Sequence, residues 1–148
     1  MAKHFSELAA WQLAVQLRHA VHAMTDSGPA RLDRDFYDDI RDAASSVPNN
    51  IAEGHARFNP TDNRRFLTFA RASLSETQNR LMEGRERNFW SDEAFHEAWR
   101  LSTRAEAAIA GLMRYLLTER AKRNAEQIKR KIKEADLEKY PDEPTFDK

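Results

Sequence analysis

The chain has 148 residues, with 24 lysines and arginines, 24 aspartates and glutamates, and no cysteine. This length fits one domain of ordinary size, and the lack of cysteine excludes disulfides, thiolate zinc sites and cysteine nucleophiles. No apolar run approaches the roughly 20 residues of a membrane span, and the N-terminus lacks a signal-peptide pattern, so we expect a soluble, cytoplasmic protein without a membrane partner. The formal net charge of zero argues against nucleic-acid binding by the chain as a whole.

The first predicted helix covers about residues 6–25 and is apolar over a wide arc. Its main stripe recurs at spacings of three and four, and a second stripe of Leu8, Trp11 and Val15 lies beside it. So wide an arc predicts contacts with two neighbours. The second predicted helix covers about residues 33–57 and opens with several aspartates, which suit the positive end of a helix dipole. Pro48 interrupts this helix, so we expect a kink or a restart there.

Two further helices are predicted at about residues 60–87 and 91–119. Asn59 and Ser91 are suitable N-caps for them. From Phe95 to Leu116, apolar and small residues alternate strictly at three and four, which is the a/d spacing of a coiled-coil seam. A second stripe on that helix consists of Leu101, Ala108 and Tyr115. No segment is typical of a strand, so residues 1–119 are predicted to form an all-α, up-down-up-down four-helix bundle.

Residues 120–148 differ from the rest in composition. Between residues 120 and 133, seven lysines and arginines face a single acid, Glu126. Apolar residues become sparse, so we expect a charged helical extension of the bundle. Acidic residues then offset the charge, and Pro141 and Pro144 predict a flexible tail.

Three stretches of the sequence carry a family pattern. Residues 40–54 contain an arginine and several small residues that lead into a Pro-x-Asn-Ile-Ala-Glu-Gly run. The opening residues 5–14 and the Phe-Leu pair at residues 66–67 accompany it. Together they resemble the bacterial four helix bundle proteins, also called the large-subunit (23S) ribosomal RNA intervening-sequence protein family. The chain departs from the family pattern at Asp42, where a second basic residue is common, and at Ala72, where glycine is usual.

The resemblance covers about residues 5–117 and implies a left-handed four-helix bundle that assembles into a homopentameric ring, with no known catalytic activity. Genes of this family lie in intervening sequences within ribosomal RNA. A related branch, the accessory variability proteins of diversity-generating retroelements, binds reverse transcriptase and nucleic acid through a basic surface. The resemblance therefore suggests two partners, a reverse transcriptase and RNA or DNA, and no cofactor.

The family motif is a polar stretch inside an amphipathic helix, and its polar groups need partners. One interpretation is that the asparagines and the glutamate satisfy backbone groups at the kink or pair across a subunit boundary. The other is a ligand site, in which Glu53 is the carboxylate to test for a buried hydrogen bond. The motif consists of Pro48, Asn49, Asn50, Ile51, Ala52, Glu53 and Gly54.

The chemistry-bearing residues form no recognised catalytic or metal pattern. A di-iron bundle site needs two Glu-x-x-His pairs, and the sequence offers one, Glu93 with His96. His19 and His22 share a face of the first helix, but no nearby carboxylate completes a metal site. The serines lie on small-residue helical positions without a nucleophile elbow. We therefore expect no enzyme activity, no metal and no cofactor.

Two kinds of surface are candidates for function. The apolar stripes exceed the needs of one bundle seam and predict an oligomer interface, formed by Leu8, Trp11, Val15, Leu101, Ala108 and Tyr115. The basic residues form either a solvated face or a nucleic-acid-binding surface. In a ring, each subunit carries the same basic surface, so that several copies can bind one nucleic acid together. These basic residues are Arg57, Arg64, Arg65, Arg71, Lys122, Arg123, Lys129, Arg130, Lys131 and Lys133.

These features favour two functions. The first is a non-enzymatic, oligomeric scaffold that recruits a protein partner such as a reverse transcriptase. The alternative is direct RNA or DNA binding through basic patches repeated around the ring.

Overall fold

Five α-helices and two short 3-10 helices make up residues 2–139, the part of the chain that the computed structural model describes. No strand occurs in this part, which confirms the predicted all-α class. The elements are η1 (Phe5–Glu7), α1 (Ala9–Thr25), η2 (Pro29–Leu32), α2 (Arg34–His55), α3 (Pro60–Glu86), α4 (Asp92–Tyr115) and α5 (Glu119–Lys139). The part of the predicted flexible tail that follows Lys139 lies outside the described residues.

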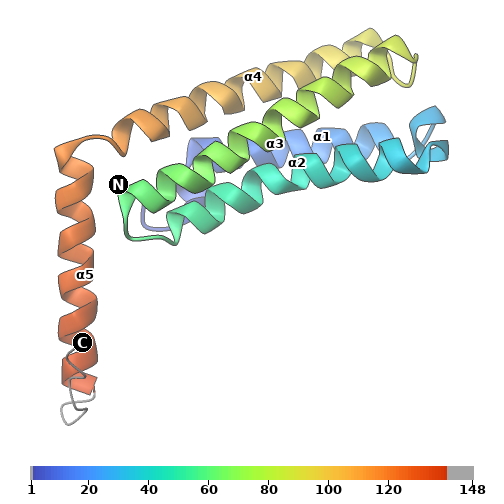
Figure 1. Cartoon of the computed structure of the whole chain (residues 1–148). Coiled ribbons are helices and arrows are strands. Elements are labelled where there is room, and N and C mark those ends of the chain that lie inside the picture. The colour runs from blue at the N-terminus through green and yellow to red at the C-terminus, as the bar shows by residue number, and fades with distance from the viewer. Residues whose placement is uncertain (1, 140–148) are drawn as a thin grey trace.

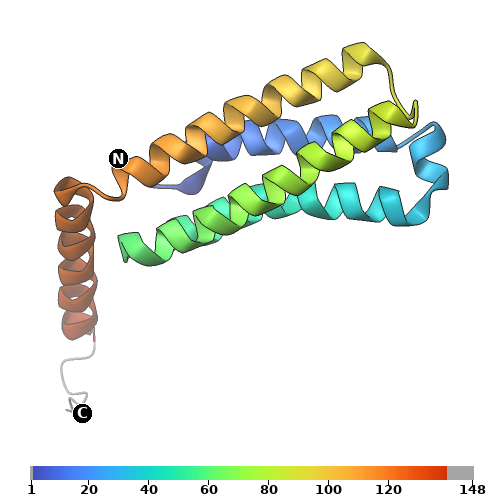
Figure 2. The ribbon, with the colours of Figure 1, turned by 45° about the horizontal axis from the view of Figure 1, so that its top comes forward.

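The first four helices pack lengthwise into a helical bundle, whereas α5 leaves it at a steep angle (Figure 1). α2 packs against α1 and α3, and α4 packs against the same two helices. Figure 2 shows the same arrangement from a second direction. Each helix of the bundle therefore has two helical neighbours, as expected for α1 from its wide apolar arc. None of the helices in residues 2–139 is long and apolar enough to cross a membrane.

The core is built from the apolar stripes of all four bundle helices. On α4 the predicted seam is buried from Phe95 to Ile109, whereas Leu112 further along is partly exposed. Removal of these side chains from water is the main favourable contribution to folding. The largest fully buried side chains include Leu17, Val21, Ile40, Val47, Ile51, Leu67, Leu74, Leu81 and Ile109.

Polar caps set where three of the helices begin. The side chains of Asp33, Asn59 and Ser91 accept hydrogen bonds from backbone N–H groups in the first turns of α2, α3 and α4. These N–H groups have no partner within their own helix, so a capping side chain stabilises the helix start. α1 has no side-chain cap, and it begins at Ala9 because residues 5–7 form η1 instead.

A joint at residues 116–118 separates α4 from α5. The predicted fourth helix ran to residue 119, whereas α4 ends at Tyr115. Thr118 Oγ1 accepts a hydrogen bond from Ala121 N at 3.3 Å, so Thr118 caps the start of α5. At the inner end of α5, Ala121 and Ala125 are buried, and the rest of the helix points away from the bundle (Figure 1).

Candidate functional site

The family motif lies in the second half of α2, which runs through Pro48 without a break. The restart considered at Pro48 therefore does not occur. Proline removes one backbone donor from the helix, but Pro48 is fully buried, so close packing offsets part of this cost. Asn50 Nδ2 donates hydrogen bonds to Ser46 O at 2.9 Å and to Ser46 Oγ at 3.0 Å. Ser46 Oγ lies 2.8 Å from Ser73 Oγ, so this polar group links α2 to α3.

The other polar residues of the motif face solvent. Asn49 and Glu53 are exposed, whereas Ile51 between them is in the core. Glu53 Oε1 accepts a hydrogen bond from Arg57 Nη2 at 3.1 Å, and both side chains are about half exposed. Glu53 therefore does not make the buried hydrogen bond that a ligand site would call for. An exposed ion pair of this kind adds little to stability.

Gly54 marks a close approach between α2 and α3. A Cβ atom at this position would lie 2.8 Å from Asn63 Oδ1 and 3.0 Å from Phe66 Cβ. Side chains in a close-packed interior leave no room for such contacts, so any residue other than glycine would push the helices apart. Helix packing thus accounts for the glycine that ends the motif.

Arginines and aromatic rings alternate at the turn between α2 and α3. The Arg57 guanidinium lies 4.8 Å from the ring centre of Phe66. The Arg65 guanidinium lies 5.6 Å from Phe66 and 5.9 Å from Phe69. Phe58 and Phe69 remain 47% and 45% exposed. Exposed rings beside cations offer stacking and positive charge together. We name Arg57, Phe58, Arg65 and Phe69 the Arg–Phe patch.

Sequence reasoning missed the two phenylalanines of this patch. It considered the arginines only as charges, and it assigned no role to Phe58. The available signal was the spacing along α3, where Phe69 follows Arg65 by four residues. Residues four apart share one face of a helix.

The remaining basic residues lie in different environments. Arg64 is partly buried, and its Nε has no hydrogen-bond partner within residues 2–139. Arg71 is exposed further along α3. The cations of the extension all occupy exposed positions on α5, namely Lys122, Arg123, Lys129, Arg130, Lys131 and Lys133. The predicted basic residues therefore form two groups, one on α3 and its preceding turn and one along α5.

A cavity of about 700 Å³ lies at the end of the bundle where α5 departs. Its walls come from the N-terminal segment, α2, α3 and α4 near one end of the bundle, and the inner half of α5. Much of the lining is apolar, as at Leu8 and Ile128, and Lys3 and Arg57 are its strong cations. Among the described residues that line it, none is an aspartate or glutamate.

The predicted interface residues are divided between the surface and the core. Leu101 is 5% exposed and belongs to the core of its own chain, so it has little surface to offer a second subunit. α1 and α4 pack against each other, which places the other predicted residues on neighbouring elements. The partly exposed ones are Leu8, Trp11, Val15, Ala108 and Tyr115.

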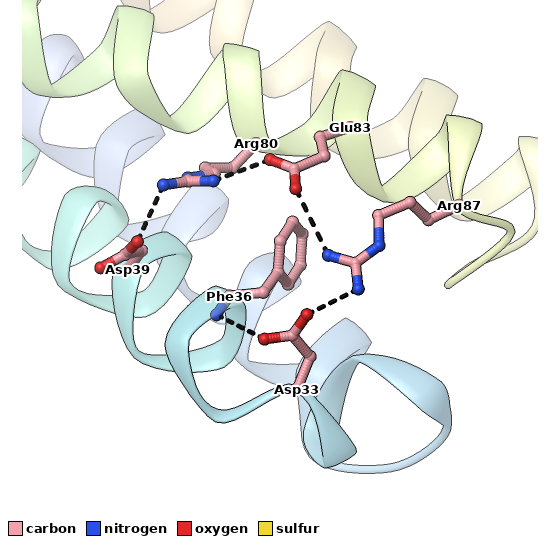
Figure 3. Close-up of polar contacts among 6 residues, drawn as sticks. All are labelled: Asp33, Phe36, Asp39, Arg80, Glu83 and Arg87. Carbon is pink, nitrogen blue, oxygen red and sulfur yellow. Dashed lines mark hydrogen bonds and ion pairs between the residues drawn. The ribbon is translucent and has the colours of Figure 1, made fainter.

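An ion-pair network joins the start of α2 to the end of α3 (Figure 3). Arg87 pairs with Asp33 at 2.6 Å and with Glu83 at 3.3 Å. Arg80 pairs with Glu83 at 2.7 Å and with Asp39 at 2.8 Å. The pKa of Asp33 is held below its usual range, first by the backbone N–H that its carboxylate accepts and then by Arg87. The network was not predicted, because its α2 and α3 members are 41 and 54 residues apart in the chain.

The histidines and acids considered for catalysis or metal binding lie apart. Glu93 and His96 are exposed near the start of α4. His22 is partly buried, and burial is the main cause that lowers its pKa, with the charge of Arg41 next in importance. Within residues 2–139, no three histidine, aspartate or glutamate side chains gather as metal ligands would.

The fold defines a small all-α bundle protein, whose surface carries exposed basic and apolar groups. Residues 6–111 match the family described as 23S rRNA-intervening sequence protein, so the chain belongs to this family. This match confirms the resemblance carried by the motif in α2. It extends from η1 into α4 and does not include α5. None of the curated proteins matches the chain.

Proposed function

We propose that this protein is a non-enzymatic scaffold that assembles through its helix faces. In this proposal, α1, α2, α3 and α4 form a left-handed, up-down-up-down four-helix bundle, and copies of the bundle form a homo-oligomeric ring. The family resemblance implies five subunits. The ring recruits a protein partner such as a reverse transcriptase.

The observation that supports assembly is the apolar surface on α1 and α4. Trp11, Ala108 and Tyr115 pack against the core and yet stay partly exposed. Apolar side chains grouped on adjacent helices are typical of interaction sites, unlike single exposed ones. A second subunit that covers them gains about 25 cal/mol for each Å² of apolar surface removed from water.

Replacement of Trp11 by glutamine tests the assembly. We expect Trp11→Gln to lower the mass measured by light scattering while the helicity measured by circular dichroism is kept. Phe69→Gln on α3 is the matched control, because it also removes a partly exposed aromatic ring but leaves α1 and α4 intact. An unchanged mass for Trp11→Gln contradicts the proposed interface.

Recruitment is tested separately with a purified reverse transcriptase from a diversity-generating retroelement, the kind of partner that the family resemblance suggests. We expect the two proteins to elute together from a sizing column, in a complex whose mass is the sum of the ring and the enzyme. Separate elution at micromolar concentrations contradicts recruitment. It does not bear on the assembly of the ring, which the Trp11→Gln variant tests.

The second candidate function is direct RNA or DNA binding, which the Arg–Phe patch supports. Arg57 and Arg65 both lie against the ring of Phe66, the exposed ring of Phe69 lies beside Arg65, and the exposed Phe58 follows Arg57 in the chain. Bases can therefore stack on the exposed rings while the guanidinium groups neutralise phosphates. Stacking on an aromatic side chain contributes about 1–3 kcal/mol per base, and phosphate contacts make binding salt-dependent.

A gel shift with single-stranded RNA tests this candidate. We expect Arg57→Glu with Arg65→Glu to weaken binding strongly at low salt, and Phe69→Ala to weaken it with little change in the salt dependence. Arg31→Glu with Arg34→Glu makes the same charge change at the other end of α2 and serves as the control. Absence of any shift at low salt rules this function out.

A further inference from the structure

α5 carries an apolar seam that its own bundle covers in part. Small and apolar residues recur along the helix at spacings of four, three, four and three, which is a coiled-coil pattern. The seam consists of Ala121, Ala125, Ile128, Ile132 and Ala135.

The inner and outer halves of this seam have different surroundings. Ala121 and Ala125 are 4% and 8% exposed, because they lie against the bundle. Ile128 borders the cavity, and Ile132 is 40% exposed. Both views show that α5 runs across one end of the bundle and that its outer half projects past the side of the bundle, so the other helices do not cover this half (Figures 1 and 2).

We propose that the outer halves of α5 from two copies of this chain pair side by side in antiparallel orientation. In this arrangement Ile132 of one copy lies opposite the partner's Ala135, and the same contact occurs a second time by two-fold symmetry. A contact of this kind is isologous, since the same surface serves on both subunits.

The charges that flank the seam select the antiparallel orientation. Lys129 and Asp136 stand on one side of the seam, and Lys131 and Glu138 stand on the other. Antiparallel helices bring like flanking positions together, so Lys129 faces the partner's Asp136. By the same geometry, Lys131 faces the partner's Glu138. Each ion pair occurs twice, and all four are between opposite charges.

A parallel pair is less favourable for the same sequence. It brings only Lys131 opposite an acid, the partner's Asp136, so two ion pairs form instead of four. It also puts both bundles at the same end of the pair, where they compete for space. The observed charge pattern therefore specifies antiparallel pairing with a second copy of this chain.

This pairing goes beyond the proposed ring and does not depend on it. α5 lies outside the region that matches the family, so the contact is a feature of this chain. A ring with an odd number of subunits cannot pair all of its α5 helices internally, so pairing joins two rings. The overlap is short and its contacts are few, and several such contacts acting together raise the strength of the association.

Charge-reversal variants of the full-length chain test the pairing. We expect Lys129→Glu with Lys131→Glu to halve the mass measured by light scattering, and Asp136→Lys with Glu138→Lys to do the same. Mixing the two variants restores opposite charges at every pair, so the mass returns to that of the wild type. Lys122→Glu with Arg123→Glu reverses two charges on the inner half of α5 and is expected to leave the mass unchanged.

The outcomes separate this inference from the ring proposal. The mass of the charge-reversed variants gives the number of subunits in the unpaired assembly and so tests the ring proposal. The ratio of the wild-type mass to the mass of these variants tests the pairing of α5, which predicts a ratio of two. A wild-type mass equal to that of both variants overturns the pairing. Loss of RNA binding with no change of mass also overturns it, because the basic half of α5 then serves a nucleic acid.

Cysteine cross-linking tests the orientation, since the chain has no cysteine of its own. We mix a chain carrying Ile132→Cys with one carrying Ala135→Cys under mild oxidation. Antiparallel pairing predicts mainly mixed disulfides between the two chains. A predominance of disulfides between two Ile132→Cys chains indicates parallel pairing and overturns the proposed geometry.

Discussion

Gly54 shows how a single residue sets the distance between two helices. Its lack of a side chain lets α2 approach the Asn63 and Phe66 positions of α3. The motif around it appeared from the sequence to be a polar site or a kink. In the structure the apolar residues of the motif pack in the core, and its glycine allows close contact between α2 and α3. Asn49 and Glu53 are exposed on the surface.

Substitution of Gly54 by alanine is expected to destabilise the protein by about 1–3 kcal/mol, because the added methyl group overpacks the contact with α3. The free energy of unfolding in urea measures the effect. Gly111→Ala on α4 is the control, since a Cβ atom there would meet only Arg114 Nη2, at 3.7 Å. That change is expected to be neutral or to stabilise the helix by up to about 1 kcal/mol.

Asp33 gives a pH-dependent contribution to stability. Its pKa is lowered in the folded protein, first by the N–H at the start of α2 and then by Arg87. A group whose pKa is lowered on folding stabilises the native state above its unfolded pKa, near 4 for aspartate. This stabilisation disappears as the pH falls through the lower, folded-state pKa.

Asp33→Asn is therefore expected to lower the melting temperature at pH 7 and to have a shrinking effect as the pH falls below about 4. Thermal melts followed by circular dichroism across this range check the prediction. Asp42→Asn, an exposed change on the same helix, is the comparison. A difference between Asp33→Asn and the wild type that persists at the lowest pH contradicts the assignment.

At the scale of the element, the sequence predicted the starts of the helices, because residues close together in the chain determine where a helix begins. The predicted caps Asn59 and Ser91 mark the starts of α3 and α4. The aspartates that open the second predicted helix mark the start of α2, where Asp33 is the N-cap rather than a first-turn residue. The end of α4 was not marked, because the apolar spacing continues through Leu116 although the helix stops at Tyr115. At Pro48 we expected a kink or a restart; α2 continues through Pro48 without a restart, and close packing around the buried ring offsets part of the cost of the lost backbone hydrogen bond.

The same reasoning explains what was missed at the candidate surfaces. Leu101 follows the spacing of a second stripe, yet α4 has two helical neighbours and buries it. The ion pairs of Arg87 with Asp33 and of Arg80 with Asp39 depend on how α2 lies beside α3. The residue pattern within one helix does not show which residues of another helix lie beside it, so these ion pairs can be identified only from the structure.

The α4 seam is tested by Ile109→Asp. Ile109 is fully buried, so this change places an unpaired charge in the core and costs several kcal/mol. We expect loss of the cooperative thermal transition measured by circular dichroism. Ala107→Asp, two residues away on an exposed position, should melt like the wild type. Normal melting of Ile109→Asp contradicts the seam.

At the scale of the whole molecule, charge is balanced in total but unevenly distributed. The full chain has no formal net charge, whereas residues 120–133 carry seven cations and one acid. A molecule without net charge has little electrostatic repulsion between copies, and an uneven distribution adds attraction between unlike regions.

Solubility is therefore expected to be lowest near pH 7 at low ionic strength, and to rise with added salt or at pH 9. Turbidity and light scattering across pH and salt measure this. The variant Lys129→Glu with Lys131→Glu lowers the isoelectric point, so its solubility minimum should move to a lower pH. A minimum that stays near pH 7 in that variant contradicts the explanation.

Because α5 is joined to the bundle by the short connection at residues 116–118, a small rotation there moves the far end of the helix by a larger distance. With 21 residues at 1.5 Å each, the helix is about 30 Å long, so a rotation of about 10° at the joint displaces its far end by roughly 5 Å. The cavity adjoins this fulcrum and shares Leu116 with it. If a ligand bound in the cavity turned this joint, the far tip of α5 would move much further than the joint itself.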